Sequence, residues 1–352
     1  MFEELLQAWD GESTVIRYDA AARAWIFIGV HSTRLGPATG GTRMKVYPTP
    51  ADALRDVHRL SSAMTRKLAA AGMPYGGGKA VIAVEEIPSG EARRELLLRY
   101  AALVDSLGGS YLTAPDVNTG EADMDIISER TRYVFGRSVA NGGSGNTAPA
   151  TALGVFAAIR ASLEHATGSA DVAGRTVLVQ GVGDVGRRLA EHLARAGARL
   201  LVTDINEAAV EAACRDLGAT AVPPGEALTT PCDVLAPCAL GGVLSSETIP
   251  LLRCRVVCGA ANNQLLRDED ADLFAKHNIL YAPDYVANAG GVMHGLGLEQ
   301  LHWSQHHLEQ RLEGIGDTLR EIFGMAEAEG ISTERAAQRL VARRLEEGLP
   351  AD

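Results

Sequence analysis

One lysine stands beside a cluster of glycines and directly before an apolar segment. Lys79 follows Gly76-Gly77-Gly78 and precedes an apolar run over 80–84 that predicts a buried strand. A lysine in such a place is partly desolvated, which lowers its proton affinity and suits it to acid–base work. The glycines invite comparison with a phosphate-binding P-loop, but Ala80 stands where that motif needs a serine or threonine. Lys79 is therefore a candidate for proton transfer rather than for triphosphate binding.

A second lysine and an aspartate could complete such a site. The segment that starts at Thr49-Pro50 predicts a helix, on which Lys67 follows Met64 at helical spacing. Lys67 therefore shares an apolar face, where it either extends to the solvent rim or faces a cleft and holds an anion. Asp116 follows a predicted strand at 111–114 and is either a turn residue or the partner of a lysine. In one cleft, one lysine would bind a carboxylate, and the other lysine with Asp116 would manage protons.

A glycine-rich turn near the middle of the chain has the spacing of a dinucleotide-binding loop. A predicted strand at 176–180 leads into Gly181-Val182-Gly183-Asp184-Val185-Gly186 and then into a helix, which is the context that G-x-G-x-x-G requires. The next predicted strand ends at Asp204, 18 residues after Gly186, where an acidic side chain can bind a ribose 2′-hydroxyl. The alternative is a glycine-rich turn that binds nothing. Because a carboxylate would repel a 2′-phosphate, the pattern predicts NAD as the cofactor, held by Gly181, Gly183, Asp184, Val185, Gly186 and Asp204.

The pattern of apolar segments predicts an α/β protein of two domains. A chain of 352 residues is long enough for two cores. The small, polar segment 138–149 is interpreted as a hinge, after which short strands alternate with helices as in a doubly wound parallel sheet. These strands are predicted at 176–180, 199–203, 219–222, 233–236, 255–258 and 279–282, with helices at 184–196 and 206–216. The first part contains a predicted strand at 24–30 and a helix over 90–107. We therefore expect domains at 1–140 and 141–324 with a cleft between them, and helices of 325–352 that pack back on the first domain.

Composition argues against several classes of function. The formal net charge is −11, whereas nucleic-acid binders usually carry a basic excess, so no nucleic-acid partner is predicted. No apolar run reaches the roughly 18 residues of a membrane helix, and the N-terminus lacks the pattern of a signal peptide, so no membrane association is predicted. Five cysteines form no disulfide pattern, which predicts a reducing, cytoplasmic location. Cys254 and Cys258 are four residues apart, but core thiols explain them better than zinc, and no metal site is predicted.

Several segments, in order along nearly the whole chain, resemble one known family. They are 35–43, 61–67, 76–79, 115–117, 236–242, 259–263 and 281–291. These segments resemble the Glu/Leu/Phe/Val dehydrogenases, and most closely the leucine, valine and phenylalanine dehydrogenases of bacteria. The resemblance implies an N-terminal α/β domain for substrate binding and oligomerisation, followed by a Rossmann-type NAD-binding domain. It also implies a homo-oligomeric enzyme that catalyses reversible, NAD-dependent oxidative deamination of a hydrophobic L-amino acid to the 2-oxo acid and ammonia.

The resemblance further implies roles for individual residues. Lys79 and Asp116 would be catalytic, with Lys79 polarising the carbonyl group or activating water and Asp116 acting as its acid–base partner. Lys67 would bind the substrate carboxylate with help from Asn262, and Gly40 would also belong to the substrate-binding residues. The pocket for the substrate side chain would be lined by Thr39, Met64, Ala114 and Val292. The cofactor would also be contacted by Thr147 and Thr151 at the carboxamide, by Asn288 at the nicotinamide ribose, and by Ala239.

Other interpretations remain open from the residues alone. A 2-hydroxy-acid dehydrogenase would need a catalytic histidine, for which His294 is a candidate, but the two lysines would then be unexplained. A cofactor-binding regulator without turnover would not need Lys67, Lys79 and Asp116 together. By the resemblance, Ala114 and Val292 favour aliphatic substrates, whereas the segments 10–12, 115–119 and 135–138 look most like a phenylalanine dehydrogenase and favour aromatic ones. We therefore expect a broad specificity that excludes glutamate.

Overall fold

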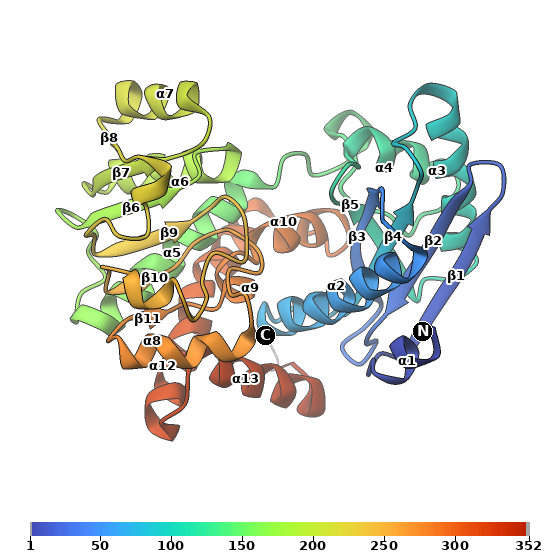
Figure 1. Cartoon of the computed structure of the whole chain (residues 1–352). Coiled ribbons are helices and arrows are strands. Elements are labelled where there is room, and N and C mark those ends of the chain that lie inside the picture. Colours follow the sequence, from blue (N-terminus) through green and yellow to red (C-terminus); the bar gives the residue numbers. More distant parts are fainter. Residues whose placement is uncertain (1, 350–352) are drawn as a thin grey trace. The chain divides into compact units, whose positions relative to one another are not determined.

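The computed structural model describes residues 2–349 and divides into two compact units (Figure 1). The first unit comprises Met1–Gly145, Gly295–His302 and Arg343–Asp352, and the second comprises Asn146–His294 and Trp303–Ala342. The first boundary, between Gly145 and Asn146, falls inside the small, polar segment 138–149. The chain therefore passes from one unit to the other four times, and the first unit is assembled from three stretches of sequence.

The first unit is built on one mixed sheet. Its elements are α1 (Phe2–Gln7), β1 (Ser13–Asp19), β2 (Ala24–Val30), β3 (Ala38–Lys45), α2 (Pro50–Ala70), β4 (Gly76–Ala83), α3 (Gly90–Asp105), β5 (Tyr111–Pro115), α4 (Glu121–Ser128) and the 3₁₀ turn Val139–Asn141. The strand order is β1-β2-β4-β3-β5, with β2 antiparallel to both of its neighbours and β3 parallel to both of its own. Strand β3 therefore separates β4 from β5, the strands that carry or precede the candidate catalytic residues.

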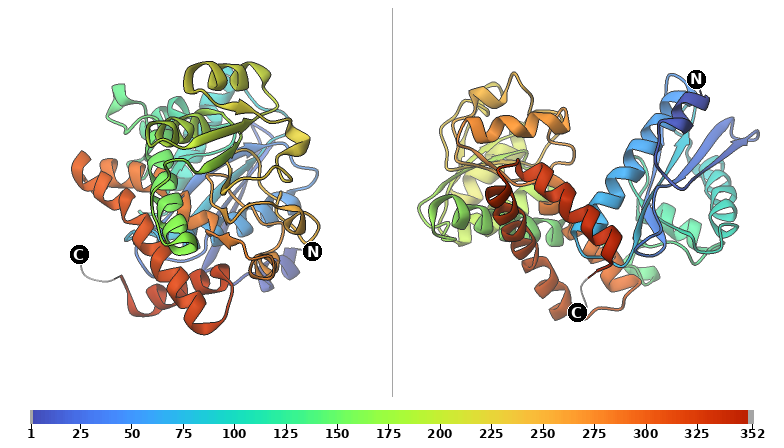
Figure 2. Two further views of the ribbon diagram at one scale, coloured as in Figure 1. Left: turned by 90° about the vertical axis from the view of Figure 1, so that its left-hand side faces the viewer. Right: turned by 90° about the horizontal axis from the view of Figure 1, so that it is seen from below.

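Both faces of this sheet are covered, which explains the continuous apolar runs of its central strands. Every residue of β4 is buried, because successive side chains point to opposite faces and each face has a helical layer. On one face Ile82 packs in a core with Tyr100 of α3, and on the other Val81 packs with Leu54 and Val57 of α2. The right-hand view of Figure 2 shows α2 and α3 on opposite sides of the strands.

The second unit contains the predicted doubly wound sheet. Its elements are α5 (Ala148–Thr167), β6 (Thr176–Gln180), α6 (Asp184–Arg195), β7 (Arg199–Thr203), α7 (Glu207–Leu217), β8 (Thr220–Ala221), β9 (Val234–Pro237), β10 (Val256–Val257), α8 (Asp272–Lys276), β11 (Leu280–Tyr281), α9 (Asp284–Ala287), α10 (Gly290–Glu299, whose second half belongs to the first unit), α11 (Gln305–Glu313), α12 (Ile315–Glu329) and α13 (Thr333–Glu347, whose end also belongs to the first unit), with 3₁₀ turns at Pro224–Glu226, Ile249–Leu251 and Asp268–Ala271. The predicted strands 24–30, 176–180 and 199–203 are confirmed with the same bounds as β2, β6 and β7.

The order of these strands fixes where a ligand can bind. All six run parallel in the order β11-β10-β9-β6-β7-β8, so the chain winds outward from β6 to β8 and then outward the other way from β9 to β11. The direction in which successive strands are added to the sheet therefore reverses between β6 and β9. In doubly wound sheets the crevice at the carboxyl ends of the strands beside such a reversal is the binding place for dinucleotides.

The C-terminal helices differ from the expectation that 325–352 pack on the first domain. Leu319, Ile322 and Phe323 of α12 are buried in the second unit, which also contains α13 as far as Ala342. At the start of α13 the Thr333 hydroxyl donates to the carbonyl of Tyr281 over 2.7 Å. The second unit therefore contains most of 325–352, and only the segment from Arg343 onward belongs to the first.

A buried carboxylate holds the chain just before the first boundary. Glu299, whose side chain is 2% exposed, accepts hydrogen bonds at Oε1 from the backbone N–H groups of Gly136 and Ser144, both over 2.9 Å, and from the Ser144 hydroxyl over 2.7 Å. Its Oε2 lies 3.6 Å from Nε of Arg137. The segment 136–144 is therefore fixed at several points to the end of α10, which lies more than 150 residues later in the sequence.

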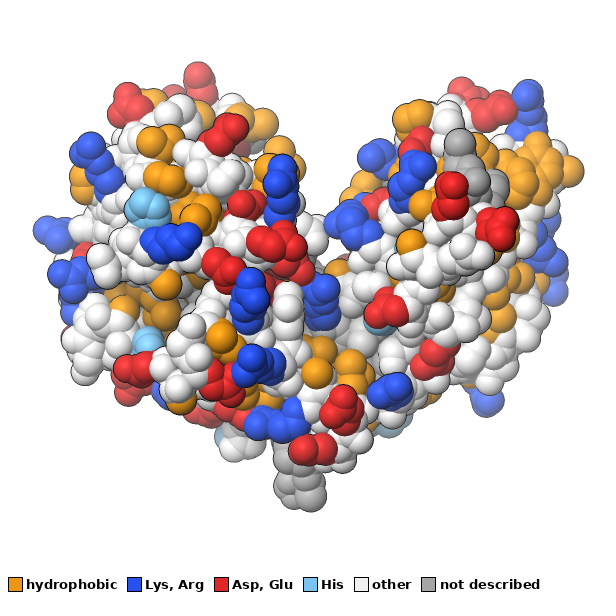
Figure 3. All heavy atoms as spheres, turned by 60° about the horizontal axis from the view of Figure 1, so that its bottom comes forward, with side chains coloured by type: hydrophobic (Ala, Val, Ile, Leu, Met, Phe, Trp, Pro, Cys, Tyr) orange, Lys and Arg blue, Asp and Glu red, His pale blue; other side chains and the backbone are white. Residues whose placement is uncertain are grey.

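On the face drawn in Figure 3, acidic and basic side chains are interspersed over both units. Within residues 2–349 no helix combines the length and the apolar composition that a membrane span requires.

Candidate active site and dinucleotide-binding loop

The sheet of the first unit brings Lys79 and Asp116 into contact. Lys79 lies in β4 and Asp116 directly follows β5, and Nζ of the lysine is 3.0 Å from Oδ1 of the aspartate. The Lys79 side chain is 7% exposed, whereas that of Asp116 is 21% exposed. The structure therefore joins the two residues that the sequence suggested as a proton-transfer pair, and it leaves the carboxylate as the more accessible partner.

Two glycines of β3 make this approach possible. A Cβ atom on Gly40 would lie 1.8 Å from the carbonyl oxygen of Gly78, and one on Gly41 would lie 2.9 Å from Cβ of Asp116. Separations under 3 Å do not occur for real Cβ atoms, so any side chain at either position would push the neighbouring backbone away. The structure thus explains on steric grounds why position 40 is a glycine, and the contact of Gly40 with substrate stays a prediction.

The predicted pocket residues of the first unit lie on the same face of the sheet as Lys79. In the strand register Thr39 is beside Gly77, and Ala114 is beside Gly41. Since side chains alternate with period two, Lys79, Thr39 and Ala114 all point to the face that α2 covers. Thr39 and Ala114 are buried there, at 0% and 7% exposure.

Helix α2 supplies the other two residues of this group. It begins where the sequence predicts, with the Thr49 hydroxyl accepting a hydrogen bond from the Asp52 N–H over 3.2 Å. A Cβ atom on Gly77 would lie 2.1 Å from a backbone nitrogen of α2, so this helix rests directly on β4. Met64 and Lys67 are half-buried near its C-terminal end. The Arg344 guanidinium donates to the carbonyls at the end of α2, at Ala69 over 3.0 Å and Ala70 over 2.7 Å.

The electrostatic setting of the Lys79–Asp116 pair separates the two groups. Burial lowers the pKa of Lys79, against the opposing effect of the Asp116 charge. Burial alone would raise the pKa of Asp116, but the nearby charges of Lys79 and Arg43 hold that pKa below its usual value. A buried lysine with a weakened hold on its proton, beside an ionised carboxylate, is suited to pass a proton in either direction.

The glycine-rich loop of the second unit uses each of its three glycines differently. Gly181 has φ of +98°, a conformation that L side chains rarely adopt, and it abuts Ala239 after β9. A Cβ atom on Gly186 would lie 1.9 Å from the carbonyl oxygen of Gly181, so this glycine allows α6 to pack against the loop. The position that a Cβ atom of Gly183 would take has nothing within 4 Å. Gly183 is exposed at the N-terminus of α6, where backbone N–H groups can face a pyrophosphate.

Charged residues at this loop are held in defined positions. Asp204 accepts hydrogen bonds from the backbone N–H groups of Val182, over 2.8 Å, and Asn206, over 2.9 Å. Its charge is thus fixed beside the glycine loop, and carboxylate lone pairs remain for ribose hydroxyls. Asp184, in the first turn of α6 next to Val185, pairs with Arg188 over 2.9 Å and accepts from Asn146 over 2.7 Å.

The remaining predicted cofactor residues gather at two places in the second unit. Nδ2 of Asn288 donates to the carbonyl of Ala260 over 3.1 Å and to Oδ1 of Asn262 over 2.9 Å, while Oδ1 of Asn288 is buried without a hydrogen-bond partner in the described structure. In α5, the Thr151 hydroxyl donates to the carbonyl of Thr147 over 3.1 Å. A Cβ atom on Gly291 would touch the hydroxyls of both threonines, so Val292, the next residue, lies close to them.

These features fit a dinucleotide. The open side of Gly183 leaves the backbone accessible to a phosphate, the Asp204 carboxylate lies beside the loop as a further acceptor, and the buried Oδ1 of Asn288 is an acceptor that needs a donor such as a hydroxyl group.

Comparison with known families decides the assignment. Residues 18–133 match the family described as Glu/Leu/Phe/Val dehydrogenase, dimerisation domain, and residues 142–211 and 201–347 match the family described as Glutamate/Leucine/Phenylalanine/Valine dehydrogenase. The chain belongs to the Glu/Leu/Phe/Val dehydrogenase family. It is therefore an amino acid dehydrogenase, and the two-domain α/β fold expected for this family is confirmed.

Individual members of the Glu/Leu/Phe/Val dehydrogenase family resemble this chain over nearly its full length. A leucine dehydrogenase of Geobacillus stearothermophilus is 41% identical over 341 residues, which are 97% of this chain and 92% of that protein. A valine dehydrogenase of Streptomyces virginiae is 44% identical and covers 95% of this chain and 93% of its own length. The crystal structure of L-tryptophan dehydrogenase from Nostoc punctiforme superposes with a TM-score of 0.86 and 38% identity over 99% of both chains.

Sequence reasoning about this dehydrogenase missed two charged residues, of which one contacts Asp116 and the second contacts the first. Arg43 of β3 donates from Nε to Oδ2 of Asp116 over 2.8 Å and from Nη1 to Asp56 of α2 over 2.9 Å. Arg43 follows Gly41 by two residues and so lies on the same face of β3, a spacing that could have indicated it once β3 was recognised as a strand. Asp56 gave no such signal, because only the fold brings α2 over this part of the sheet.

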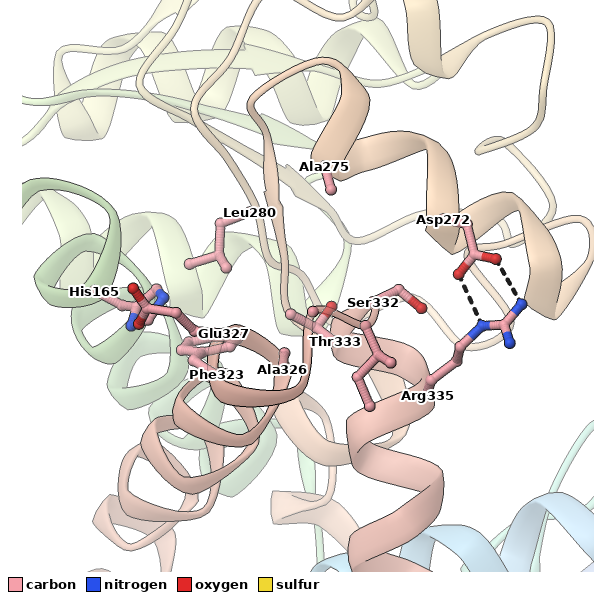
Figure 4. Close-up of a pocket in the computed structure, with 12 residues that line it drawn as sticks. His165, Asp272, Ala275, Leu280, Phe323, Ala326, Glu327, Ser332, Thr333 and Arg335 are labelled. Atoms are coloured by element: carbon pink, nitrogen blue, oxygen red, sulfur yellow. Dashed lines mark hydrogen bonds and ion pairs between the residues drawn. The ribbon is translucent and has the colours of Figure 1, made fainter.

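A large pocket of the dehydrogenase has none of the predicted site residues in its lining. It has a volume of about 560 Å³, belongs to the second unit, and is lined by residues of α5, α8, α12 and α13 (Figure 4). Phe323 and Leu280 form part of its apolar wall, and the Arg335 guanidinium is closed on the Asp272 carboxylate over 2.7 and 3.0 Å. The arginine of the lining is thus paired with a carboxylate, and the lining also contains the acidic side chain of Glu327.

Proposed function

We propose that this chain catalyses the reversible, NAD-dependent oxidative deamination of a hydrophobic L-amino acid to the 2-oxo acid and ammonia. The observation that carries the proposal is the buried Lys79 ammonium 3.0 Å from the Asp116 carboxylate, in a sheet face that also bears the predicted pocket residues. NAD, when bound, accepts the hydride from the α-carbon of the amino acid. One amino acid, one NAD⁺ and one water then give one 2-oxo acid, one ammonium ion, one NADH and one proton.

The side chains of the first unit would bind the substrate and move its protons. Lys67 at the end of α2 would pair with the substrate carboxylate, with help from Asn262. Hydride loss leaves an imine, and Lys79 would take a proton from the water that attacks it and polarise the resulting carbonyl. Asp116 would exchange protons with Lys79 and with the departing nitrogen. The lowered pKa of Lys79 supports this role, because it leaves more of the amine unprotonated and so able to accept a proton.

The second unit supports NAD rather than NADP. The Asp204 carboxylate is held by two backbone N–H groups, and those bonds do not neutralise its charge as a basic side chain would. A 2′-phosphate placed at that carboxylate would meet like charge. Thr147, Thr151, Ala239 and Asn288 would contact the nicotinamide half of the cofactor.

The substrate side chain would be accepted by Thr39, Met64, Ala114 and Val292. None of these four side chains is basic, which argues against glutamate as a substrate. The relatives named leucine and valine dehydrogenase support aliphatic substrates, and the tryptophan dehydrogenase supports room for large rings in this fold. We therefore expect activity on large aliphatic and on aromatic L-amino acids.

We further propose that the enzyme is a homo-oligomer, which the family description of 18–133 as a dimerisation domain supports. A reducing, cytoplasmic location stays a prediction from composition. The five cysteines are all free thiols, which is compatible with it.

Absorbance at the NADH band, recorded with a panel of substrates, tests the proposal. The panel contains leucine, valine, phenylalanine and glutamate, the 2-hydroxy acid with the leucine side chain, and each cofactor in turn. Oxidation of leucine, valine or phenylalanine with NAD is the expected result. Oxidation of the hydroxy acid alone would instead indicate a 2-hydroxy-acid dehydrogenase, and NAD binding without turnover on any substrate would indicate a regulator.

A further inference from the structure

Both oxygens of the Asp116 carboxylate are held by cations from different strands. Lys79 of β4 contacts Oδ1 over 3.0 Å, and Nε of Arg43 in β3 contacts Oδ2 over 2.8 Å. A carboxylate held at one oxygen can still turn about its side-chain torsions, whereas one held at both has a single orientation. Arg43 and Lys79 together therefore fix the orientation of the Asp116 carboxylate.

Arg43 is itself held in place from α2. Its Nη1 donates to Oδ2 of Asp56 over 2.9 Å, so the planar guanidinium bridges two carboxylates. Asp56 also accepts from the Tyr47 hydroxyl over 2.7 Å and from Nη2 of Arg59 over 2.8 Å. The side chains of Arg43 and Asp56 are 18% and 15% exposed, which limits how far water can replace these bonds.

We propose that Arg43 and Asp56 are positioning residues of the reaction: Arg43 fixes the orientation of Asp116, and Asp56 fixes Arg43 and offsets its charge. This inference rests on the proposed roles of Lys79 and Asp116. Neither residue needs to touch the substrate, because each acts through the next member of the chain Asp56–Arg43–Asp116–Lys79. Small displacements of a reacting group cost as much as a hundredfold in rate, so a fixed carboxylate has catalytic value.

The two residues have opposite electrostatic effects on the reacting pair. The structure records Arg43 of β3 in contact with Asp116, Asp56 of α2 in contact with Arg43, and Tyr47 and Arg59 in contact with Asp56. Removing the positive charge of Arg43 makes a proton on Asp116 or Lys79 more stable, whichever of them limits the rate. Removing the negative charge of Asp56 makes it less stable. The pH profile must therefore move in opposite directions in the two variants, which a general loss of structure would not produce.

The test measures kcat and kcat/KM against pH in the full chain, with the amino acid that the wild type uses best. Arg43→Met is expected to lower kcat by 10-fold or more and to move the acidic limb upward by about 1–3 pH units, the usual effect of losing an arginine partner. Asp56→Asn, which keeps an acceptor oxygen, is expected to move the limb downward by less than one unit. Arg43→Lys keeps the charge but cannot bridge both carboxylates, so the limb should stay within about half a unit while kcat falls.

Arg93→Met is the matched control. Arg93 pairs with Asp123 over 2.7 and 2.8 Å in the same unit, and the two side chains are 20% and 10% exposed, close to those of the Arg43 pair. It should lose comparable thermal stability with no shift in the pH profile.

Several results would overturn the inference. An unshifted profile in Arg43→Met, shifts of equal sign in Arg43→Met and Asp56→Asn, or a full wild-type kcat in Arg43→Lys would each do so. If Arg43→Met does not fold, Arg43→Lys and Asp56→Asn still decide the question. A wild type without activity on any amino acid would overturn the proposed function as well, whereas an active wild type with unshifted variants overturns this inference alone.

Discussion

Two substitutions of Glu299 remove different numbers of the contacts that hold the segment 136–144. Glu299 accepts three hydrogen bonds at Oε1, two from Ser144 and one from Gly136, and presents Oε2 to Arg137 at 3.6 Å. Glu299→Ala removes all of these contacts. Glu299→Gln retains an acceptor oxygen for the three bonds but places an NH₂ group opposite the Arg137 N–H, so two donors face each other.

The expected magnitudes follow from this count. At about 1 kcal/mol net for each hydrogen bond, Glu299→Ala should lower the free energy of unfolding by about 3 kcal/mol. Glu299→Gln should cost about 1 kcal/mol, since only the charge and the contact with Arg137 are lost. For a unit of this size, 1 kcal/mol corresponds to about 2–4 °C in Tm. The first thermal transition should therefore fall by about 6–12 °C in the alanine variant and by about 2–4 °C in the glutamine variant.

Calorimetry on the full-length variants measures the transition, and steady-state kinetics measures the functional effect. Because residues at a hinge often change kcat and KM together, we expect both constants to change in Glu299→Ala and neither in Glu299→Gln. Glu129→Ala is the control, since Glu129 also binds an arginine, over 2.6 and 2.9 Å, but at an exposed site where solvent screens the ion pair and its contribution to stability is small. Equal transition temperatures for Glu299→Ala and Glu129→Ala would refute the reasoning.

Four further predictions concern the reaction, the cofactor, the substrate and pH. Lys79→Ala should lower kcat by roughly 10²–10⁴, while Lys45→Ala, at an exposed lysine of the same sheet, should leave it unchanged; near-normal turnover of the first variant would remove Lys79 from the mechanism. The wild type should prefer NAD, and Asp204→Ser should narrow the ratio of kcat/KM between NAD and NADP; equal use of both by the wild type would show that Asp204 does not face the ribose. Ala114→Gly should raise kcat/KM for phenylalanine relative to leucine by opening space for the ring, and an unchanged or reversed preference would exclude Ala114 from the pocket. Burial, with the nearby charge of a second histidine, lowers the pKa of His58 from 6.5 to about 4, so between these pH values the unfolded chain binds a proton that the folded chain does not. The free energy of unfolding should therefore fall as the pH drops from 6.5 toward 4, by up to about 1.4 kcal/mol per pH unit. Urea unfolding of His58→Gln between pH 6.5 and 5 should lack this contribution, and an equal slope of stability against pH in both proteins would contradict it.

The elements that the sequence predicts well are those whose signal is local. Strands β6 and β7 are short apolar runs next to strong turn residues, and α2 has its cap, its first-turn proline and its apolar stripe in the sequence itself. The glycine loop is equally local, because strand, turn and helix follow one another within 20 residues.

Strand β3 shows why the rest could not be found in this way. Its sequence contains Gly40-Gly41, which lowers strand propensity, and those glycines are needed only because Gly78 and Asp116 approach from neighbouring strands. The contact of Arg43 with Asp116 joins residues 73 positions apart, and it depends on a strand order that periodicity does not reveal. The placement of α12 and α13 likewise follows from which apolar faces meet, and not from their order in the chain.

The division of the first unit into three stretches has a consequence for how the chain matures during synthesis. The helix that bears Lys67 is among the earliest parts to leave the ribosome, yet the guanidinium that binds its terminal carbonyls belongs to Arg344, which is translated after the whole of the second unit. The carboxylate of Glu299 likewise arrives long after the segment 136–144 that it binds. The part of the protein made first is thus the last to be completed, and a fragment that stops at Gly145 would lack both of these anchors.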